Sequence, residues 1–168
     1  MIPTLKTERL VLRPHVMEDF PQYRDMMGSD HARYMGGPFE PRAAWDVFCQ
    51  DVAGWHLFGH GALAVDLADG TPIGQVGVSA GPLFPEREIG WTAYPGHEGR
   101  GYMTEAARAL REWAFANLSH DRLVSYIDPR NARSIALAER LGAVPDEAAP
   151  RQDPDDLVFV HPQPEARP

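Results

Sequence analysis

The sequence has only one cysteine, Cys49, in 168 residues. An intrachain disulfide is therefore impossible, and zinc sites built from several cysteines are excluded. Cys49 follows Trp45 and Phe48 in a stretch with helical apolar spacing. This spacing indicates a buried, inert thiol rather than a nucleophile. The lack of paired cysteines favours a reducing compartment, so we expect a cytoplasmic protein.

Long apolar runs and metal-binding motifs are missing as well. No stretch approaches the roughly 18 apolar residues of a membrane helix, and the first residues lack the apolar segment of a signal peptide. The seven histidines include no His-Glu-x-x-His or equivalent spacing. His56 and His60 flank an expected turn at Phe58-Gly59, so we interpret them as surface histidines. We expect no metal and no membrane contact.

Positive charge is scarce, because 16 Lys and Arg oppose 24 Asp and Glu for a net charge of −8. Such a deficit disfavours nucleic-acid binding. An acidic surface attracts cationic amines, although acidity also serves solubility alone. With 43% hydrophobic residues the chain can fill one core. We expect one domain over residues 1–168, with its core at about 7–161 and a flexible tail at 162–168.

Hydrophobic periodicity predicts an α/β (α+β) fold with a mixed, mostly antiparallel sheet and about four flanking helices. A helix between two strands of one sheet requires those strands to be parallel, and this applies to the strands at 86–94 and 122–127. An exposed edge strand at 157–161 would permit dimerisation, so monomer and homodimer both stay open. The remaining expected strands are 9–13, 61–67 and 72–78, the helices are 18–27, 42–52, 102–118 and 131–141, and the loops are 31–41 and 146–156.

The most informative segment runs from residue 98 to residue 106, between a strand and a long helix. A helix start leaves backbone N–H groups unpaired and carries partial positive charge, and glycines let an anion approach closely. The segment therefore predicts a pyrophosphate site, or else a glycine-rich turn without a ligand. It has neither a Walker ending nor the third glycine of the dinucleotide fingerprint. The expected contacts are the amides of Gly99, Gly101, Tyr102, Met103 and Thr104, with added charge from Arg100.

This segment resembles motif A of the GNAT superfamily of acyl-CoA-dependent N-acyltransferases, Gln/Arg-x-x-Gly-x-Gly/Ala, with Glu98, Gly101 and Met103 at its positions. The fuller string is similar to that of the RimJ/RimL-like branch, the ribosomal-protein N-terminal acetyltransferases and their relatives. Residues 7–14, 88–91 and 131–143 resemble further segments of that branch in the same order. The resemblance covers about residues 7–161 and implies the GNAT-like fold, in which the parallel strands splay apart.

The resemblance implies acetyl-CoA as the donor, bound at Glu98 and the amides after it. It also implies that the backbone of Trp91, Thr92 and Ala93 polarises the thioester carbonyl. Asn131 is expected to cap its helix and to contact the pantetheine arm.

Candidate catalytic residues follow from the same alignment. Glu88 is our candidate general base, because family members often carry an acidic residue there and Gly90 leaves room on its face. A solvated strand-end carboxylate is the alternative for Glu88. Ala138 stands where many members have a Tyr acid, so Ser134 is the next candidate, or else a polar first-turn residue. Tyr34 and Trp55, from the region around His31 and Arg33, are candidate substrate contacts or ordinary packing residues.

The sequence thus predicts an acetyl-CoA-dependent N-acetyltransferase. It would move an acetyl group to a primary amine, a protein N-terminus or a small molecule, by direct attack in a ternary complex. A catalytically silent CoA-binding sensor or regulatory module is the alternative, which the missing Tyr at Ala138 keeps open. A nucleotide- or nucleic-acid-binding domain is disfavoured by the acidity and by the absent Walker ending.

Overall fold

Eight strands form one sheet in the computed structural model, which describes residues 1–119 and 121–164, and their order is β1-β2-β3-β4-β5-β6-β8-β7. The strands are β1 (Leu5–Lys6), β2 (Leu10–Arg13), β3 (Ala62–Leu67), β4 (Pro72–Ser79), β5 (Glu88–Ala93), β6 (Val124–Ile127), β7 (Val144–Pro145) and β8 (Leu157–Val160). The helices are η1 (Met17–Asp19), α1 (Phe20–Met27), η2 (Asp30–Met35), α2 (Pro41–Leu57), α3 (Tyr102–Asn117) and α4 (Ala132–Arg140).

The strand directions confirm the predicted mixed sheet. Strands β1 to β5 pair antiparallel in chain order, and β6, β8 and β7 form a second antiparallel group. The two groups meet at the parallel pair β5 and β6, where α3 makes the crossover connection. The sheet therefore consists of two antiparallel halves joined at one parallel seam.

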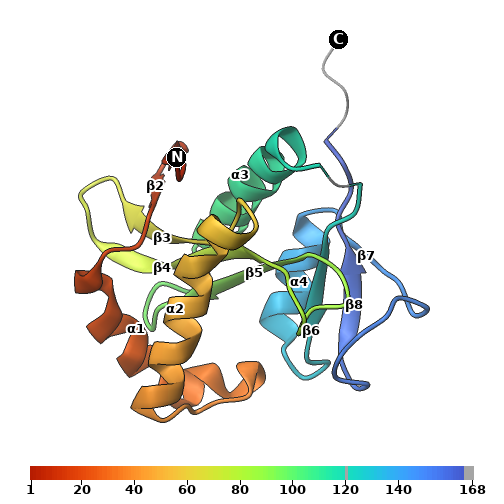
Figure 1. The fold of residues 1–168 in the computed structure, drawn as a ribbon, viewed down its shortest axis with the longest axis horizontal. Coiled ribbons are helices and arrows are strands. Elements are labelled where there is room, and N and C mark those ends of the chain that lie inside the picture. Colours follow the sequence, from red (N-terminus) through yellow and green to blue (C-terminus); the bar gives the residue numbers. More distant parts are fainter. Residues whose placement is uncertain (120, 165–168) are drawn as a thin grey trace.

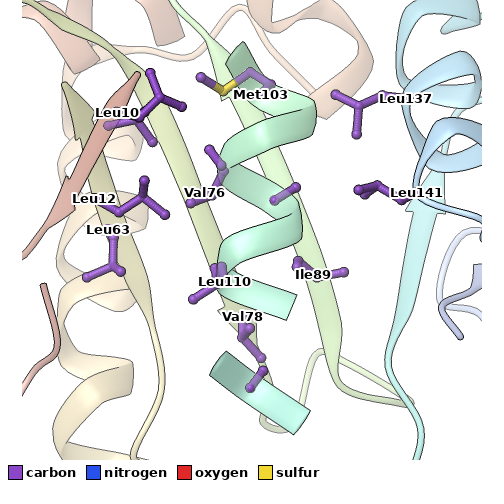
Figure 2. Close-up of a cluster of buried hydrophobic side chains, with 14 of the residues drawn as sticks. Leu10, Leu12, Leu63, Val76, Val78, Ile89, Met103, Leu110, Leu137 and Leu141 are labelled. Carbon is purple, nitrogen blue, oxygen red and sulfur yellow. The ribbon is translucent and has the colours of Figure 1, made fainter. Parts of the chain in front are cut away.

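Helices cover both faces of the sheet (Figure 1), and the strands alternate accordingly. In β4, Val76 and Val78 pack in the cluster that includes Leu110 of α3. The alternate positions, Gln75 and Gly77, lie on the opposite face, which α1 and α2 cover. Figure 2 shows the first cluster, in which Leu110 and Ile89 are fully buried between α3 and the sheet. Burying one such side chain contributes about 1.5–3 kcal/mol. The other face holds a separate aromatic and methionine cluster around Tyr23, Met26 and Phe48.

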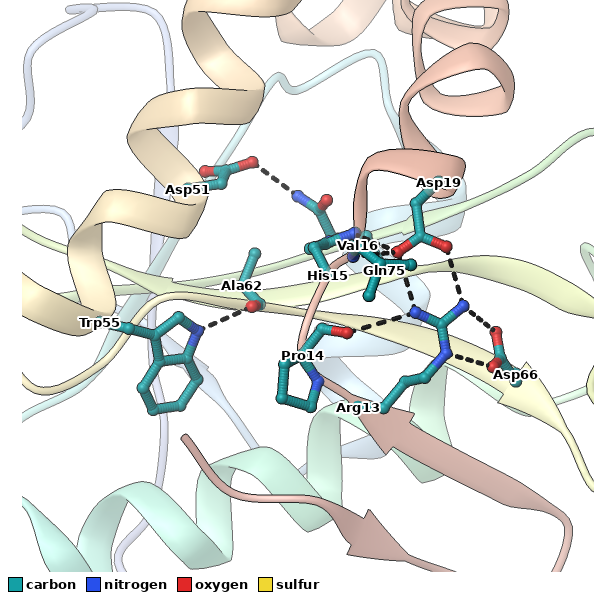
Figure 3. A network of polar contacts seen from close by, with 10 residues as sticks. All are labelled: Arg13, Pro14, His15, Val16, Asp19, Asp51, Trp55, Ala62, Asp66 and Gln75. Carbon is teal, nitrogen blue, oxygen red and sulfur yellow. Dashed lines mark hydrogen bonds and ion pairs between the residues drawn. The ribbon is translucent and has the colours of Figure 1, made fainter. Parts of the chain in front are cut away.

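A buried ionic network anchors the layer of α1 and α2 to the sheet. Arg13 of β2 donates to Asp66 of β3 at 2.6 Å and to Asp19 at 2.8 Å, as Figure 3 shows. Burial alone would raise the pKa of Asp19, but hydrogen bonds from Arg13, His15 and the Val16 N–H hold that pKa well below its usual range. Removing one member of such a network costs several kcal/mol, about 3–5. The network thus fixes where α1 starts above the sheet.

The structure corrects several sequence predictions. Helix α2 ends at Leu57 rather than at residue 52, and the expected loop 31–41 contains most of η2. Strand β8 is not an edge strand, because β7 pairs along its outer side. His60 is not a surface residue, since it is 1% exposed and its Nδ1 lies 2.8 Å from the Val78 carbonyl oxygen. Cys49 is half-buried rather than buried.

Two further predictions, on membrane helices and on the C-terminal tail, can be compared only with the residues that the structure describes. Within residues 1–119 and 121–164, no helix combines the length and the apolar composition that crossing a bilayer requires. The tail predicted at 162–168 lies outside the described residues from position 165 onward.

Candidate active site

The parallel seam opens into a wedge. Glu88 and Val124 are the one ladder pair between β5 and β6 in the described part of the chain, and the Val124 N–H donates to the Arg87 carbonyl at 3.0 Å. Beyond this pair, the Ser125 hydroxyl donates to the Ile89 carbonyl at 2.6 Å and lies 2.9 Å from Nε2 of His161. Burial lowers the pKa of His161 to about 4, so this ring is neutral near pH 7. A side chain therefore bridges the strands where their backbones separate.

A cleft of about 1800 Å³ passes through this wedge. It is lined on one side by residues of α3 and α4, such as Arg108 and Ser134, and on the other by residues of α1 and α2, such as Tyr23 and Asp51. Small-molecule pockets usually have roughly 300–1000 Å³, so the cleft has room for two ligands. No group of His, Cys, Asp and Glu in the residues described could hold a metal ion.

The turn before α3 has the geometry of an anion cradle. Gly99 and Gly101 have φ of 74° and 77°, in the left-handed region that favours glycine. A Cβ on Gly99 would meet open space, and no side chain of the described residues caps the helix at Gly101. The amides of Tyr102, Met103 and Thr104 then belong to the uncapped first turn of a sixteen-residue helix. These residues fit a phosphate group.

Arg9 adds a cation to this cradle that the sequence did not predict. Its guanidinium donates to Glu105 at 2.7 Å and to the Arg100 carbonyl at 3.0 Å, and it lies 4.7 Å from the Tyr102 ring centroid. Thr7 donates to the same carboxylate at 2.6 Å. Burial alone would raise the pKa of Glu105, but these hydrogen bonds lower it. Arg9 and Glu105 are 96 residues apart in the chain, so no local pattern could join them.

Of the two charged residues predicted to contact the cofactor, Glu98 lines the cleft and Arg100 does not. The Glu98 carboxylate accepts from the Gly96 N–H at 2.7 Å and lies 3.5 Å from His31 and 3.6 Å from Arg133. Burial would raise the pKa of Glu98, but these partners lower it. A carboxylate cannot donate to a phosphate, so Glu98 fixes the turn and holds Arg133 beside the cleft. Arg100 contributes its carbonyl to Arg9 and does not line the cleft.

The β5 residues beyond the seam lie along the cleft, as do those at the start of α4. Trp91, Thr92 and Ala93 line it, and the Trp91 indole donates to the Ser134 hydroxyl at 3.3 Å. Asn131 caps α4 as predicted, because its Oδ1 accepts from the Ser134 N–H at 3.2 Å. Ser134 thus receives a hydrogen bond from Trp91, and its own hydroxyl proton is free to be donated.

Glu88 lies at the apex of the wedge on the face of α1 and α2. Burial raises its pKa to about 7, Asp156 and Asp51 add to this, and a hydrogen bond from the Tyr126 backbone opposes it. The side chain is half-buried and still lines the cleft. Open space lies above Gly90, two residues along β5, where no atom would come within 4 Å of a Cβ. The carboxylate therefore combines a pKa suited to proton transfer near pH 7 with access to a ligand.

The structure places the two candidate substrate contacts, Tyr34 and Trp55, in different environments. Tyr34 lines the cleft, with the Arg33 guanidinium 4.5 Å from its ring centroid. Trp55 does not reach the cleft, because α2 continues past residue 52 and carries it into the core. There its indole donates to the Ala62 carbonyl at 2.8 Å and packs edge-on against Trp113.

The fold and the cleft are those of an acyl-CoA-dependent acetyltransferase of the GNAT type. A family model described as "Acetyltransferase (GNAT) domain" matches residues 9–144, and the chain belongs to this family.

Individual relatives agree with this assignment. The chain is 57% identical to a crystal structure of the acetyltransferase from Agrobacterium tumefaciens str. C58, with a TM-score of 0.95 and coverage of 97% of this chain and 96% of that one. RimL, the ribosomal L7/L12 alpha-N-protein acetyltransferase in complex with coenzyme A, shares the fold at 15% identity, with a TM-score of 0.76 over 96% and 98% of the two chains. The uncharacterized protein YkkB of Bacillus subtilis (strain 168) is 34% identical over 82 residues, 48% of each chain. The match thus spans about half the length of this curated relative.

Proposed function

We propose that this protein is an N-acetyltransferase that transfers the acetyl group of acetyl-CoA to a primary amine. One observation carries the proposal: a half-buried carboxylate with a pKa near 7, Glu88, lies at the apex of the wedge that leads to the anion cradle. The cradle accounts for the phosphates of the donor, and the carboxylate accounts for activation of an amine. We also propose that the chain 1–168 forms one domain.

The donor would be held mainly by backbone groups. The amides from Gly99 to Thr104 and the Arg9 guanidinium would bind the pyrophosphate, and the exposed edge of β5 at Trp91 to Ala93 would bind the pantetheine arm. Asn131 at the head of α4 would add a contact to that arm. When bound, the cofactor supplies an activated acetyl group as a thioester. Amide donors aimed at its carbonyl oxygen would stabilise the charge that develops there.

Glu88 would remove the proton from the attacking amine. An ammonium ion has no lone pair, so an amine must be deprotonated before it attacks a carbonyl carbon. Cys49, the one thiol in the sequence, does not line the cleft. This favours direct attack by the amine over an acyl-cysteine intermediate.

Ser134 would assist the departing thiolate. The Trp91 indole donates to its oxygen, which orients the hydroxyl proton away from Trp91 and leaves it available to the sulfur. A thiolate is a tolerable leaving group because thiol pKa values lie near 8.5, so this assistance is expected to be modest.

A thiol-release assay with acetyl-CoA and a panel of primary amines tests the proposal. Release above the buffer rate, together with an acetylated amine detected by mass spectrometry, is the expected result. Tight CoA binding without turnover on small amines and on N-terminal peptides would instead favour a sensor or regulatory module. Activity on N-terminal peptides would support the RimJ/RimL-like branch, which we propose together with a cytoplasmic location. A monomer or a homodimer is compatible with this function.

A further inference from the structure

A second carboxylate lines the cleft from the helical layer opposite α3. Asp51 of α2 accepts a hydrogen bond from Nε2 of Gln75, on β4, at 2.7 Å, as Figure 3 shows, and another from Tyr23 of α1. All three residues line the cleft. Burial raises the pKa of Asp51 to about 6, although the hydrogen bonds from Gln75 and Tyr23 lower it. Three elements thus converge on one half-buried carboxylate.

This carboxylate has no cationic partner among residues 1–119 and 121–164. Arg13, the nearby cation of β2, is bound by Asp19 and Asp66. His15, the other basic side chain near Asp51, lies with its Nδ1 3.2 Å from Asp19. A half-buried carboxylate without a counter-ion is unfavourable in its charged form, unless it takes up a proton or a ligand supplies the opposite charge.

A second acceptor stands beside it without a donor. The Oε1 atom of Gln75 is buried and has no hydrogen-bond partner within the described chain. Its amide nitrogen is held by Asp51, so the oxygen cannot turn to find another donor without losing that bond. A buried acceptor left unpaired costs about 1–3 kcal/mol. Asp51 and Gln75 together therefore present acceptors that suit a group with several N–H donors.

The position of Asp51 relative to Glu88 sets the size of the ligand. Glu88 pairs in register with Ser79, and Gln75 lies four residues earlier on β4. At about 3.3 Å per residue, these two positions are about 13 Å apart along the strand. Between them the floor of the cleft is made by Gly77 and Gly90, which carry no side chain. An extended, narrow ligand fits this floor, and its ends would reach Glu88 and Asp51.

We propose that the acceptor is an extended amine with a second cationic group, and that Asp51 and Gln75 bind this second group while the first amine is acetylated at Glu88. The inference rests on the proposed function, and it makes Asp51 a specificity residue of that site. The second ammonium would donate to the Asp51 carboxylate and to Oε1 of Gln75. A diamine, a polyamine or a peptide N-terminus followed by a basic side chain all carry this chemistry.

Matched amines test the inference. 1,5-Diaminopentane and hexylamine have the same number of heavy atoms, and differ in that one ammonium is replaced by a methyl group. The wild-type protein is expected to prefer the diamine in kcat/KM by roughly tenfold to a hundredfold, the range of one hydrogen bond to a charged group. Asp51→Asn should remove this preference by raising KM for the diamine. It should change hexylamine turnover much less, through the contribution that Asp51 makes to the raised pKa of Glu88. Asp46→Asn, on the exposed side of the same helix, should behave as wild type.

Peptide substrates and calorimetry extend the test of this inference. Ala-Lys and Ala-Met peptides repeat the comparison for a protein N-terminus. If only the diamine or only the Ala-Lys peptide is preferred over its partner, that result identifies the acceptor as a small molecule or as a protein N-terminus. Calorimetric titration of the CoA complex with 1,5-diaminopentane reports binding without turnover, so loss of that heat in Asp51→Asn supports the inference even if no amine is acetylated. Equal use of both matched amines by the wild type would overturn it. An equal loss on both amines in Asp51→Asn would also overturn it, because Asp51 would then be merely structural.

Discussion

The two ends of the cleft are built in different ways. At the cofactor end, a continuous turn from Gly99 to Thr104 offers backbone N–H groups to the pyrophosphate, and the Arg9 guanidinium lies beside that turn. At the acceptor end, the polar groups are side chains from three elements, with Asp51 on α2, Gln75 on β4 and Glu88 on β5. Backbone amides cannot be changed by substitution except through the conformation of the turn. Side chains can be replaced one at a time.

This contrast between backbone and side-chain groups indicates which end of the cleft can change by substitution. In the proposed function, the cofactor is held by a turn whose geometry depends on two glycines. The acceptor would be held by residues that can change without disturbing that turn. Substitutions at the cofactor end should therefore act on the affinity for CoA, and those at the acceptor end on turnover and on the choice of amine.

The largest effect is expected from Gly101→Glu, which places a carboxylate in the anion cradle. The new side chain would repel phosphate and strain a backbone with φ of 77°. CoA affinity measured by calorimetry should fall by roughly a thousandfold, about 4 kcal/mol. Gly70→Glu, at an exposed hairpin turn with φ of 86°, introduces the same strain away from the cleft and should leave the Kd unchanged. An unaltered Kd in Gly101→Glu would remove the cradle from CoA binding.

Glu88→Gln should lower turnover by roughly a hundredfold to a thousandfold at neutral pH while the CoA Kd stays the same. A base works in its deprotonated form, so wild-type kcat/KM should fall as pH drops below about 7, the pKa of Glu88. The ratio of wild-type to variant activity should therefore be largest just above pH 7. It should shrink in acid, where Glu88 is protonated, and at high pH, where amines deprotonate unaided. A ratio independent of pH would contradict a base. Glu86→Gln is the neighbouring control, because Glu86 pairs with Arg122 and does not line the cleft.

Ser134→Ala should reduce kcat by about tenfold, because a thiolate leaves with only modest help. The affinity for CoA should change little, since Asn131 still caps α4 through its own side chain. Plotting kcat against the thiol pKa of a series of acyl thioesters sharpens the test, because the variant should depend more steeply on that pKa. An identical dependence in both proteins would assign Ser134 to the helix alone.

Arg9→Ala should weaken CoA binding by roughly fivefold, a smaller effect than that of the turn itself. The variant loses one cation beside the cradle and one contact to the Arg100 carbonyl, while the backbone amides persist. Raising the ionic strength should weaken wild-type binding more than that of the variant. Arg42→Ala, at an exposed pair on α2, is the control for a general loss of charge.

The smallest effect concerns stability. Asp51 and Glu88 have pKa values raised from 3.8 to about 6 and from 4.5 to about 7, so burying them is favourable in the protonated form. Their contribution to stability is present below the unfolded-state pKa and is lost as pH rises through about 6 to 7. Asp51→Asn should therefore gain about 1 kcal/mol relative to wild type at pH 8, or roughly 3 °C in Tm, and gain nothing at pH 4. Thermal unfolding at the two pH values checks this, and a gain that is equal at both would contradict it.

The sequence predicted the cofactor end better than the acceptor end, for a physical reason. The glycines of the cradle are neighbours in the chain, so their spacing alone indicates the turn that the structure contains. Arg9 could not be assigned because its partner Glu105 is 96 residues away. Asp51 was within a predicted helix, but periodicity did not indicate that it would meet Gln75 of β4. Trp55 was misplaced because α2 continues five residues beyond its predicted end.

The sequence also predicts the longer elements of the fold better than the short ones. Alternating apolar residues predicted the six longer strands, whereas the two-residue strands β1 and β7 are too short to have a pattern. The outward position expected for β8 was wrong because β7 forms only through pairing with it. A position just after a turn predicts exposure for His60, yet β3 begins two residues later and His60 is buried.

The single rung between β5 and β6 has a mechanical consequence. In the described residues one ladder pair joins the half-sheet β6, β8 and β7 to the remaining strands. Side-chain bonds such as those of the Ser125 and Tyr126 hydroxyls add to it, so few backbone hydrogen bonds resist separation. An elongated ligand between β5 and β6 would occupy the position of a strand and connect the two halves of the sheet. A donor bound there would thus be both a reactant and a part of the scaffold, and pulling the two halves apart should take more force when it is bound.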